Sequence, residues 1–296
     1  MIPSRFDYVA PSTLDDAVTL LREHGGEAKV ISGGQSLIPM LKLRLAAPTV
    51  LVDINRIEGL EYIEERDGAL RIGALVREAD VEQSAVVRDR YPLLLDTARV
   101  IADPIVRNSA TICGNVAHGD PGNDHPATMI ALDASFVLRG PNGTRTVAAR
   151  DFFVGLFTTV LEPDEILTEV VIPSPPPRSG GAYFKLERKV GDFATAAVAV
   201  QVTLDGNDTC QRVGIGLTNV GSTPIRATSA EAFLERKPLD ATTIAETALL
   251  AASAADPVAD RRGSEDYKRD VIRVLTSRAL TLAGRRARGE TSNRGS

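Results

Sequence analysis

The sequence contains no tryptophan, few aromatic residues and only two cysteines, and these absences exclude whole classes of protein. Cys113 and Cys210 are too few for a disulfide framework or for the thiolates that ligate an iron–sulfur cluster. The three histidines follow no metal-ligand spacing, and no CxxC pair is present. We therefore expect no metal bound by this chain alone, and any redox chemistry needs an organic cofactor.

A strong charge of one sign and a long apolar run are also lacking. The net charge is −5 and the isoelectric point is about 5.4, which gives no reason to expect nucleic acid or an anionic membrane as a partner. The first residues show no charged-then-apolar signal peptide, and no segment approaches the length of a membrane span. From these features the expected location is the cytoplasm.

Several nucleotide and hydrolase motifs are missing as well. There is no GxxxxGK[ST] phosphate loop, no GxGxxG that opens a helix in a β-α-β unit, and no GxSxG nucleophile elbow. Gly214 and Gly216, followed by Gly221, have the wrong spacing for a dinucleotide fingerprint, and we interpret them as strand and turn residues.

The hydrophobic patterning that is present predicts an α+β protein. Ser12 and Asp15 are typical of a capping box at the start of the first helix. A β-α-β unit opens the chain, and a proline-rich segment at residues 173–181 separates the remainder into two parts. The predicted strands cover residues 29–31, 50–54, 60–64, 69–72, 136–138, 144–147, 165–172, 182–187, 196–204 and 212–218. The predicted helices cover residues 12–24, 36–45, 78–84, 93–102, 127–132, 227–236, 243–254 and 267–282.

Two glycine-bearing stretches carry the functional signal. Residues 30–37 read VISGGQSL, and residues 107–121 read RNSATICGNVAHGDP. Glycine permits a close approach of the backbone, so that N–H groups can converge on an anion. Two such stretches, each beside apolar strand-like residues, suggest a diphosphate held from two sides. The alternative is that both are tight turns of an α/β fold.

These stretches resemble a flavoprotein family. Together with a third segment, YFKLERKVGDFA at residues 183–194, they are similar in order and spacing to the FAD-binding medium subunit of the molybdenum hydroxylases. This family includes subunits of bacterial carbon monoxide dehydrogenase and a domain of xanthine dehydrogenase, and its usual motifs are AGGQSL and TIGGN. The resemblance extends from about Phe6 to about Leu282.

The resemblance implies an FAD site but no catalytic residue and no metal ligand on this chain. Residues 30–37 would pass along the pyrophosphate, and residues 111–115 would close on the cofactor from the other side. Asp124 would bind the adenosine part, Ile101 and Leu167 would lie beside the flavin or adenine, and the charge of Lys185 would favour an anionic reduced flavin. The implied FAD-binding residues are Val30, Ile31, Ser32, Gly33, Gly34, Gln35, Ser36, Leu37, Ile101, Thr111, Ile112, Cys113, Gly114, Asn115, Asp124, Leu167 and Lys185.

It also implies a domain organisation. Residues 1–175 would form an FAD-binding domain of the vanillyl-alcohol-oxidase (PCMH) type, with subdomains at about 1–55 and 56–175. Residues 176–286 would form a smaller α+β domain like the C-terminal domain of carbon monoxide dehydrogenase flavoproteins, with an antiparallel sheet and a helix bundle. Residues 287–296 are expected to be a disordered tail.

The function implied is electron transfer within a heterotrimeric molybdenum hydroxylase. Electrons would reach the FAD from two [2Fe-2S] clusters in a small subunit, after substrate oxidation at a molybdopterin centre in a large subunit. They would leave to an external acceptor, and the assembly would be a dimer of heterotrimers. Residues 189–192 would form a mobile loop on the acceptor side, with Gly191 as its hinge. The sequence indicates neither the substrate nor the acceptor.

Alternatives stay open for individual residues and for the function. Asp124 is also a typical helix N-terminal acid, Ser36 a typical cap, Leu167 a typical core residue, and Lys185 a typical solvent-facing lysine on a strand. His118 is assigned no catalytic role. The competing functions are a free-standing FAD-dependent oxidoreductase and a bridging subunit without cofactor.

Cys113 departs from the family pattern, because the family usually has glycine at this position. If the position requires a positive φ, cysteine strains it. If φ is negative, cysteine fits as a small apolar residue.

Overall fold

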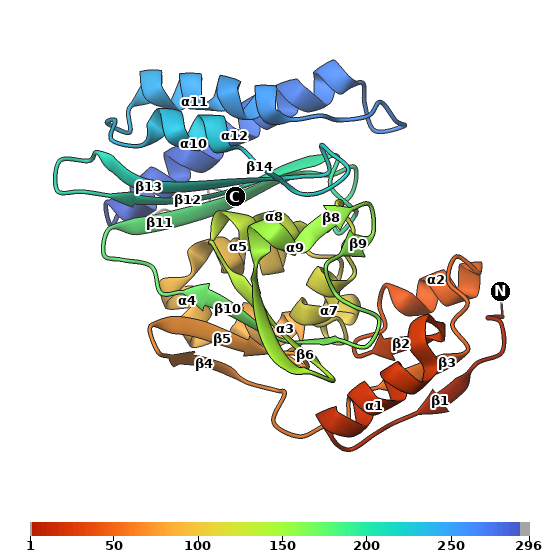
Figure 1. Cartoon of the computed structure of the whole chain (residues 1–296). Coiled ribbons are helices and arrows are strands. Elements are labelled where there is room, and N and C mark those ends of the chain that lie inside the picture. Colours follow the sequence, from red (N-terminus) through yellow and green to blue (C-terminus); the bar gives the residue numbers. More distant parts are fainter. Residues whose placement is uncertain (1, 291–296) are drawn as a thin grey trace.

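In the computed structural model, which describes residues 2–290, the chain forms three successive sheets and one short hairpin, each sheet with helices packed beside it (Figure 1). The α+β class predicted from the sequence is confirmed. The predicted tail is divided: Ala287 ends the last helix, residues 288–290 follow as a short turn, and residues 291–296 lie outside the described residues.

The first sheet contains three parallel strands in the order β1 (Asp7–Val9), β3 (Val50–Asp53) and β2 (Ala28–Ile31). Helix α1 (Leu14–His24) connects β1 to β2 and buries one apolar face. The predicted β-α-β unit is therefore present, although β1 itself was not predicted. A strand of three residues with two exposed side chains leaves no alternation to recognise.

The cap of α1 lies one residue later than predicted. Thr13, not Ser12, is the N-cap, and its hydroxyl accepts a hydrogen bond from the backbone N–H of Asp16. A helix N-cap requires an extended backbone and an acceptor aimed at the third residue beyond it. Ser12 and Thr13 both carry a hydroxyl, so the sequence did not show which of them caps the helix.

The second sheet is antiparallel and lies beside the first, with strand order β4-β5-β10-β6-β7. The predicted hairpin turns at Asp67-Gly68 and Asn142-Gly143 join β4 to β5 and β6 to β7. Most helices of this region lie between β5 and β6 in the sequence, and the chain returns to the sheet through β10. The elements of this region are β4 (Ile63–Arg66), β5 (Ala69–Gly73), α3 (Glu78–Gln83), α4 (Ala85–Arg90), α5 (Pro92–Arg99), α6 (Pro104–Arg107), α7 (Ile112–Ala117), α8 (Asp124–Ala131), β6 (Ser135–Gly140), β7 (Gly143–Ala148), α9 (Ala149–Phe152), β8 (Phe153–Gly155), β9 (Thr158–Thr159) and β10 (Ile166–Pro173).

The third sheet is also antiparallel and follows the proline-rich segment. Its strands are β11 (Ser179–Leu186), β12 (Ala196–Leu204), β13 (Cys210–Thr218) and β14 (Ile225–Arg226). One face packs on the long helix α12 (Glu265–Ala287), beside α10 (Thr228–Leu234) and α11 (Ala241–Ala254), and the other packs on α5 and α8 (Figure 1). Strands, and then helices, were predicted for this region in this order.

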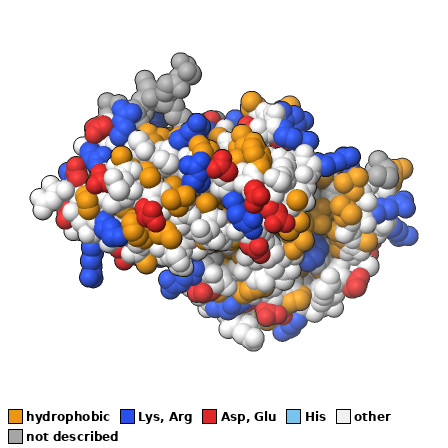
Figure 2. All heavy atoms as spheres, turned by 90° about the horizontal axis from the view of Figure 1, so that it is seen from above, with side chains coloured by type: hydrophobic (Ala, Val, Ile, Leu, Met, Phe, Trp, Pro, Cys, Tyr) orange, Lys and Arg blue, Asp and Glu red, His pale blue; other side chains and the backbone are white. Residues whose placement is uncertain are grey.

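The surface carries no dominant charge on the face seen in Figure 2, where acidic and basic side chains are interspersed with apolar ones. Among residues 2–290, no helix has the length and apolar character that crossing a bilayer requires.

Candidate functional site

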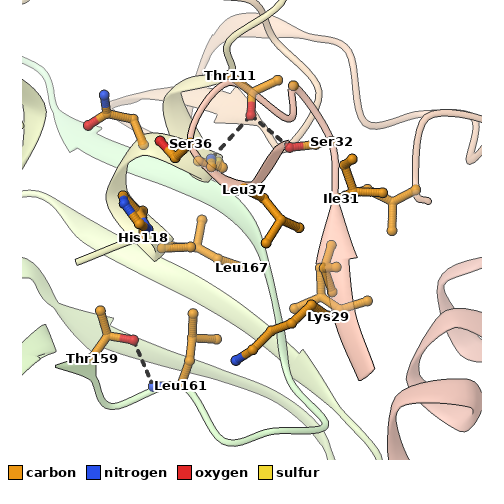
Figure 3. Close-up of a pocket in the computed structure, with 18 of the residues that line it drawn as sticks. Lys29, Ile31, Ser32, Ser36, Leu37, Thr111, His118, Thr159, Leu161 and Leu167 are labelled. Atoms are coloured by element: carbon orange, nitrogen blue, oxygen red, sulfur yellow. Dashed lines mark hydrogen bonds between the residues drawn. The ribbon is translucent and has the colours of Figure 1, made fainter. Parts of the chain in front are cut away.

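A cavity of about 510 Å³ lies between the first sheet and the second, which is within the range of small-molecule sites. One wall is the segment that joins β2 to α2 (Leu37–Leu43), and the facing wall is α7 with the residues before it. The β8–β9 hairpin and residues 161–167, which lead into β10, complete the lining. Figure 3 shows Lys29, Leu37, His118 and Leu161 around this space.

The two glycine-bearing stretches meet at this cavity. The hydroxyls of Ser32 and Thr111 lie 2.9 Å apart, and Thr111 Oγ1 also accepts a hydrogen bond from Gly114 N at 3.2 Å (Figure 3). Gly33 lies so close to the facing segment that a Cβ on it would be 2.4 Å from the carbonyl oxygen of Ser109. Only glycine allows this approach, so the cavity wall depends on the residue type at position 33.

The backbone of residues 33–36 is suited to an anion. Within residues 2–290, the N–H groups of Gly33, Gly34, Gln35 and Ser36 donate to no protein acceptor, although all four residues line the cavity. Backbone donors are normally paired in folded proteins. A row of donors without protein acceptors at a cavity wall is the arrangement that recognises phosphate oxygens.

Asn115 supplies a second polar atom that has no hydrogen-bond partner among residues 2–290. Its side-chain Oδ1 is buried and accepts no hydrogen bond, while its backbone carbonyl accepts one from Asn123 Nδ2 at 3.0 Å. A buried acceptor without a donor is costly. A bound ligand with a hydroxyl or N–H group would satisfy it.

Most of the FAD-binding residues predicted from the sequence line this one cavity. They are Val30, Ile31, Ser32, Gly33, Gly34, Gln35, Ser36, Leu37, Thr111, Cys113, Gly114, Asn115 and Leu167. Ile112, by contrast, is fully buried in the hydrophobic core and does not line the cavity. Ser36 precedes α2 but makes no side-chain capping hydrogen bond, so the alternative capping role is not realised.

The remaining predicted residues gather at a second location, beside the third sheet. Lys185 Nζ donates at 3.0 Å to Asp124 Oδ2 and at 3.0 Å to the carbonyl oxygen of Val100, which precedes Ile101. Tyr183 OH donates to Asp124 Oδ1 at 2.6 Å, and Glu187 Oε2 lies 3.4 Å from Lys185 Nζ. We call Asp124, Tyr183, Lys185 and Glu187 the Lys185 cluster.

Asp124 and Tyr183 are the buried members of the Lys185 cluster, and burial raises the pKa of both. Desolvation raises the pKa of Asp124, while the Lys185 ammonium and the Tyr183 hydroxyl act in the opposite direction. Each oxygen of Asp124 accepts from a donor, so the ionised form fits its contacts. Burial and the Asp124 carboxylate raise the pKa of Tyr183 well above its usual value, which keeps it a donor at neutral pH.

These contacts exclude one alternative for Lys185 and leave both open for Asp124. The side chain of Lys185 is only 3% exposed, so it is not a solvent-facing lysine. Asp124 is the first residue of α8, as the helix-acid alternative predicts, and it also belongs to the cluster. Asn123 connects the two locations, because it precedes Asp124 and bonds to Asn115 at the cavity.

Cys113 lies in helix α7, although no helix was predicted for residues 107–121. Its φ is not positive, so no strain arises from the cysteine. The residue is 2% exposed and belongs to the core, with Sγ 3.9 Å from the carbonyl oxygen of Ile72. Burial and the carboxylates of Glu169 and Glu78 raise the pKa of the thiol, which makes it unreactive.

Replacing Cys113 with the family's usual glycine is expected to destabilise the protein without affecting the cofactor. Glycine within a helix costs about 1 kcal/mol, and the lost burial of the side chain adds about 1 kcal/mol. Urea unfolding should therefore show a decrease of about 2 kcal/mol in the free energy of unfolding. Cys113→Ala should lose about half of that, and both variants should retain flavin. A loss of flavin in either variant would contradict the expectation that Cys113 contributes through packing and not through contact with the cofactor.

Several cavity residues were not predicted. Lys29 and His118 line the cavity, as do Phe157, Thr158 and Thr159 of the β8–β9 hairpin. The ring of His118 lies 5.2 Å from that of Phe157, and burial lowers the pKa of His118, so it is neutral at pH 7. The two strands of this hairpin have three and two residues, which is too short for a recognisable strand pattern in the sequence. Among the described residues, no group of three metal-ligating side chains is found.

The comparisons with known proteins agree with this geometry. Residues 4–175 match the family model described as "FAD binding domain in molybdopterin dehydrogenase", and residues 181–283 match "CO dehydrogenase flavoprotein C-terminal domain". The chain is 46% identical over 283 residues to the carbon monoxide dehydrogenase medium chain of Hydrogenophaga pseudoflava, covering 96% of this chain and 98% of that one. It is 43% identical over 288 residues to the medium chain of Afipia carboxidovorans, covering 97% and 100%.

A solved structure with a different named substrate is also similar. The structure of quinoline 2-oxidoreductase from Pseudomonas putida 86 matches with a TM-score of 0.90 at 32% identity, covering 99% of this chain and 100% of that one. The same fold therefore occurs in complexes that are named for carbon monoxide and for quinoline.

Proposed function

The chain belongs to the family of FAD-binding medium subunits of the molybdenum hydroxylases, and from this premise we propose that it binds FAD and transfers electrons within a multi-subunit oxidoreductase. The observation that carries the proposal is the row of N–H groups at residues 33–36, which line the cavity and have no protein acceptor among residues 2–290. A dinucleotide with a pyrophosphate provides the oxygens that such a row requires.

The proposed FAD-binding residues lie at two locations, the cavity and the Lys185 cluster, and would bind different parts of the cofactor. Residues 33–36 and Asn115 would hold the pyrophosphate part in the cavity, and the apolar lining, which includes Leu167, would enclose one end of the cofactor. Asp124 would bind the adenosine part, Ile101 would lie beside the flavin or adenine, and Lys185 would lie near the flavin. Asn123 joins the location of these residues to the cavity. Bound FAD would supply the redox chemistry, while the chain supplies binding, orientation and charge.

We propose that the electron donor and the substrate site belong to partner subunits. The two cysteines are too few to ligate a [2Fe-2S] cluster, and they lie in separate cores, Cys113 in one and Cys210 in the other. A small [2Fe-2S] subunit would pass electrons to the FAD, and a large molybdopterin-binding subunit would oxidise the substrate, in a dimer of heterotrimers. Relatives named for carbon monoxide and quinoline share this fold, which supports a substrate site outside the chain.

The domain division and the location are proposals too. We place an FAD-binding domain at residues 1–175, with subdomains at about 1–55 and 56–175, and a C-terminal domain at residues 176–286. The division is supported by the separate cores on either side of the proline-rich segment. A cytoplasmic location is supported by the two free thiols, which are typical of a reducing compartment.

Gly191→Pro is expected to slow reoxidation of the reduced flavin several-fold without changing FAD content. Gly191 has φ of +81°, which proline cannot adopt, and a Cβ there would lie 2.7 Å from the carbonyl oxygen of Ala102. The loop at residues 189–192 would therefore have to move away from Ala102, the residue that follows Ile101. Stopped-flow reoxidation by a quinone measures the effect. Gly206→Pro, on the turn between β12 and β13, is the matched control; equal rates in all three proteins would contradict a role for the loop.

The function is tested on the complex purified from its native host. The complex is denatured, the released cofactor is identified by mass and absorption, and the chains that co-purify are recorded. FAD near one per copy of this chain, together with an iron–sulfur and a molybdopterin protein, is the expected result. FAD without those partners would favour a free-standing oxidoreductase. Partners without flavin would favour a bridging subunit and overturn the FAD proposal.

A further inference from the structure

Two polar side chains outside the cavity join its two glycine-bearing stretches. Asn55 Nδ2 donates to the carbonyl oxygen of Ser32 at 2.9 Å, in the first stretch. Arg77 Nη1 donates to the carbonyl oxygen of Ser109 at 2.7 Å, in the second stretch. Arg77 Nη2 donates to Asn55 Oδ1 at 2.7 Å, which completes a chain of three hydrogen bonds from one stretch to the other. We call Asn55 and Arg77 the clasp.

The carbonyl groups that the clasp holds lie where the two cavity walls are closest. Ser109 O is the atom that a Cβ on Gly33 would approach to 2.4 Å, and the Ser32 hydroxyl meets that of Thr111 at 2.9 Å (Figure 3). The carbonyl of Ser32 and the N–H of Gly33 belong to one planar trans peptide, so they point in opposite directions. The bond from Asn55 to Ser32 therefore directs the N–H of Gly33, the first donor of the row at the cavity wall, away from the clasp.

Each member of the clasp is anchored in its own wall. The side-chain Nδ2 and the backbone N–H of Asn55 donate to Asp53 Oδ1 at 2.6 and 2.9 Å, at the end of β3. The backbone of Arg77 pairs with Thr111 in an isolated antiparallel bridge. The planar fork of arginine can donate to two acceptors at once. Both acceptors of Arg77 are neutral, and its guanidinium forms no ion pair within residues 2–290.

We propose that Asn55 and Arg77 are positioning residues for the cofactor: they set the separation of the two cavity walls and orient the first N–H group of the row that binds the pyrophosphate. The inference rests on the proposed FAD function. Neither residue lines the cavity, so both act through the backbone of Ser32 and Ser109 and not by touching the cofactor. The rival role is charge alone, because an unpaired guanidinium attracts phosphate from a distance. Lysine at position 77 would retain the charge but not the fork that meets both acceptors.

The test is fluorescence titration of the deflavinated complex with FAD. We expect Arg77→Ala and Asn55→Ala each to weaken FAD binding about tenfold, as for the loss of a hydrogen bond to a charged group. Arg77→Lys should recover little of this loss. The double variant should bind no more weakly than the weaker single variant, because both substitutions break the same chain of hydrogen bonds. Arg139→Ala is the matched control, since Arg139 Nη2 donates to Asp15 Oδ1 at 2.7 Å, which joins β6 to α1, and neither residue lines the cavity. It should bind FAD as the wild type does.

The outcomes separate this inference from the proposed function. If the wild-type complex binds no FAD, the proposed function fails. If both clasp variants unfold at a lower temperature but bind FAD with wild-type affinity, the clasp only stabilises the fold, and the inference is overturned while the FAD function stands. Full recovery in Arg77→Lys, with no effect of Asn55→Ala, would assign the effect to charge and overturn the inference as well. Should Arg77→Ala not fold, Asn55→Ala decides alone, and wild-type affinity in that variant overturns the inference.

Discussion

Gly33→Ala is expected to weaken FAD binding by about ten- to a hundredfold. A Cβ on residue 33 would lie 2.4 Å from Ser109 O, 2.8 Å from Ala110 Cα and 3.0 Å from Ser109 C. All three atoms are backbone, so no side-chain rotation relieves the contact, and the two cavity walls must separate. Overpacking of this kind costs about 1–3 kcal/mol, and each 1.4 kcal/mol is a factor of ten in affinity. Separation would also disturb the Ser32–Thr111 contact that aligns the walls.

The measurement is fluorescence titration of the deflavinated complex with FAD, together with thermal unfolding. Gly206→Ala is the matched control, because its Cβ would meet nothing within 4 Å and its φ is not positive. It should bind FAD as the wild type does. The argument fails if Gly33→Ala binds FAD with wild-type affinity. If Gly33→Ala does not fold, Gly33→Ser is measured by thermal unfolding, and its loss of stability should be at least as large.

The elements whose signal is local were predicted well from the sequence. The hairpins at Asp67-Gly68 and Asn142-Gly143 were found because these dipeptides favour the tight turns that join antiparallel strands. The long helix α12 was found because its apolar residues recur with helical spacing over many turns. Helix α7 was missed as a helix, because Cys113, Gly114 and Asn115 all have modest or poor helix propensity. Tertiary contacts decide its conformation, including the capping hydroxyl of Thr111.

The site was predictable where a motif is continuous and less so where it depends on packing. Residues 30–37 form one wall because a strand, a turn and a helix follow one another in sequence. The contact of Lys185 with Asp124 could not be foreseen, since it joins side chains that are 61 residues apart in the sequence. The compensation of Lys185 by two carboxylates is likewise a property of the assembled fold.

Arg286→Ala is expected to lower the free energy of unfolding by about 3–5 kcal/mol, the usual cost of removing one partner of a buried ion pair. Arg286, near the end of α12, donates from Nη1 to Asp96 Oδ2 at 2.7 Å and to the carbonyl oxygen of Gly181 at 2.6 Å. Asp96 lies on α5 and is 2% exposed, so its carboxylate cannot turn to solvent when the guanidinium is lost. The backbone N–H of Tyr183 also donates to Asp96 Oδ2.

This ion pair joins the two halves of the molecule at the strand that carries Lys185. Urea unfolding measures the loss, and Arg285→Ala is the matched control, because Arg285 is half exposed and pairs only with Glu290 among the described residues. The control should change stability by less than about 1 kcal/mol, as is usual for surface pairs. A double-mutant cycle with Asp96→Asn isolates the coupling between the two side chains. If Arg286→Ala costs no more than Arg285→Ala, the pair does not hold β11 against α5. The position of the Lys185 cluster would then have to depend on apolar packing alone.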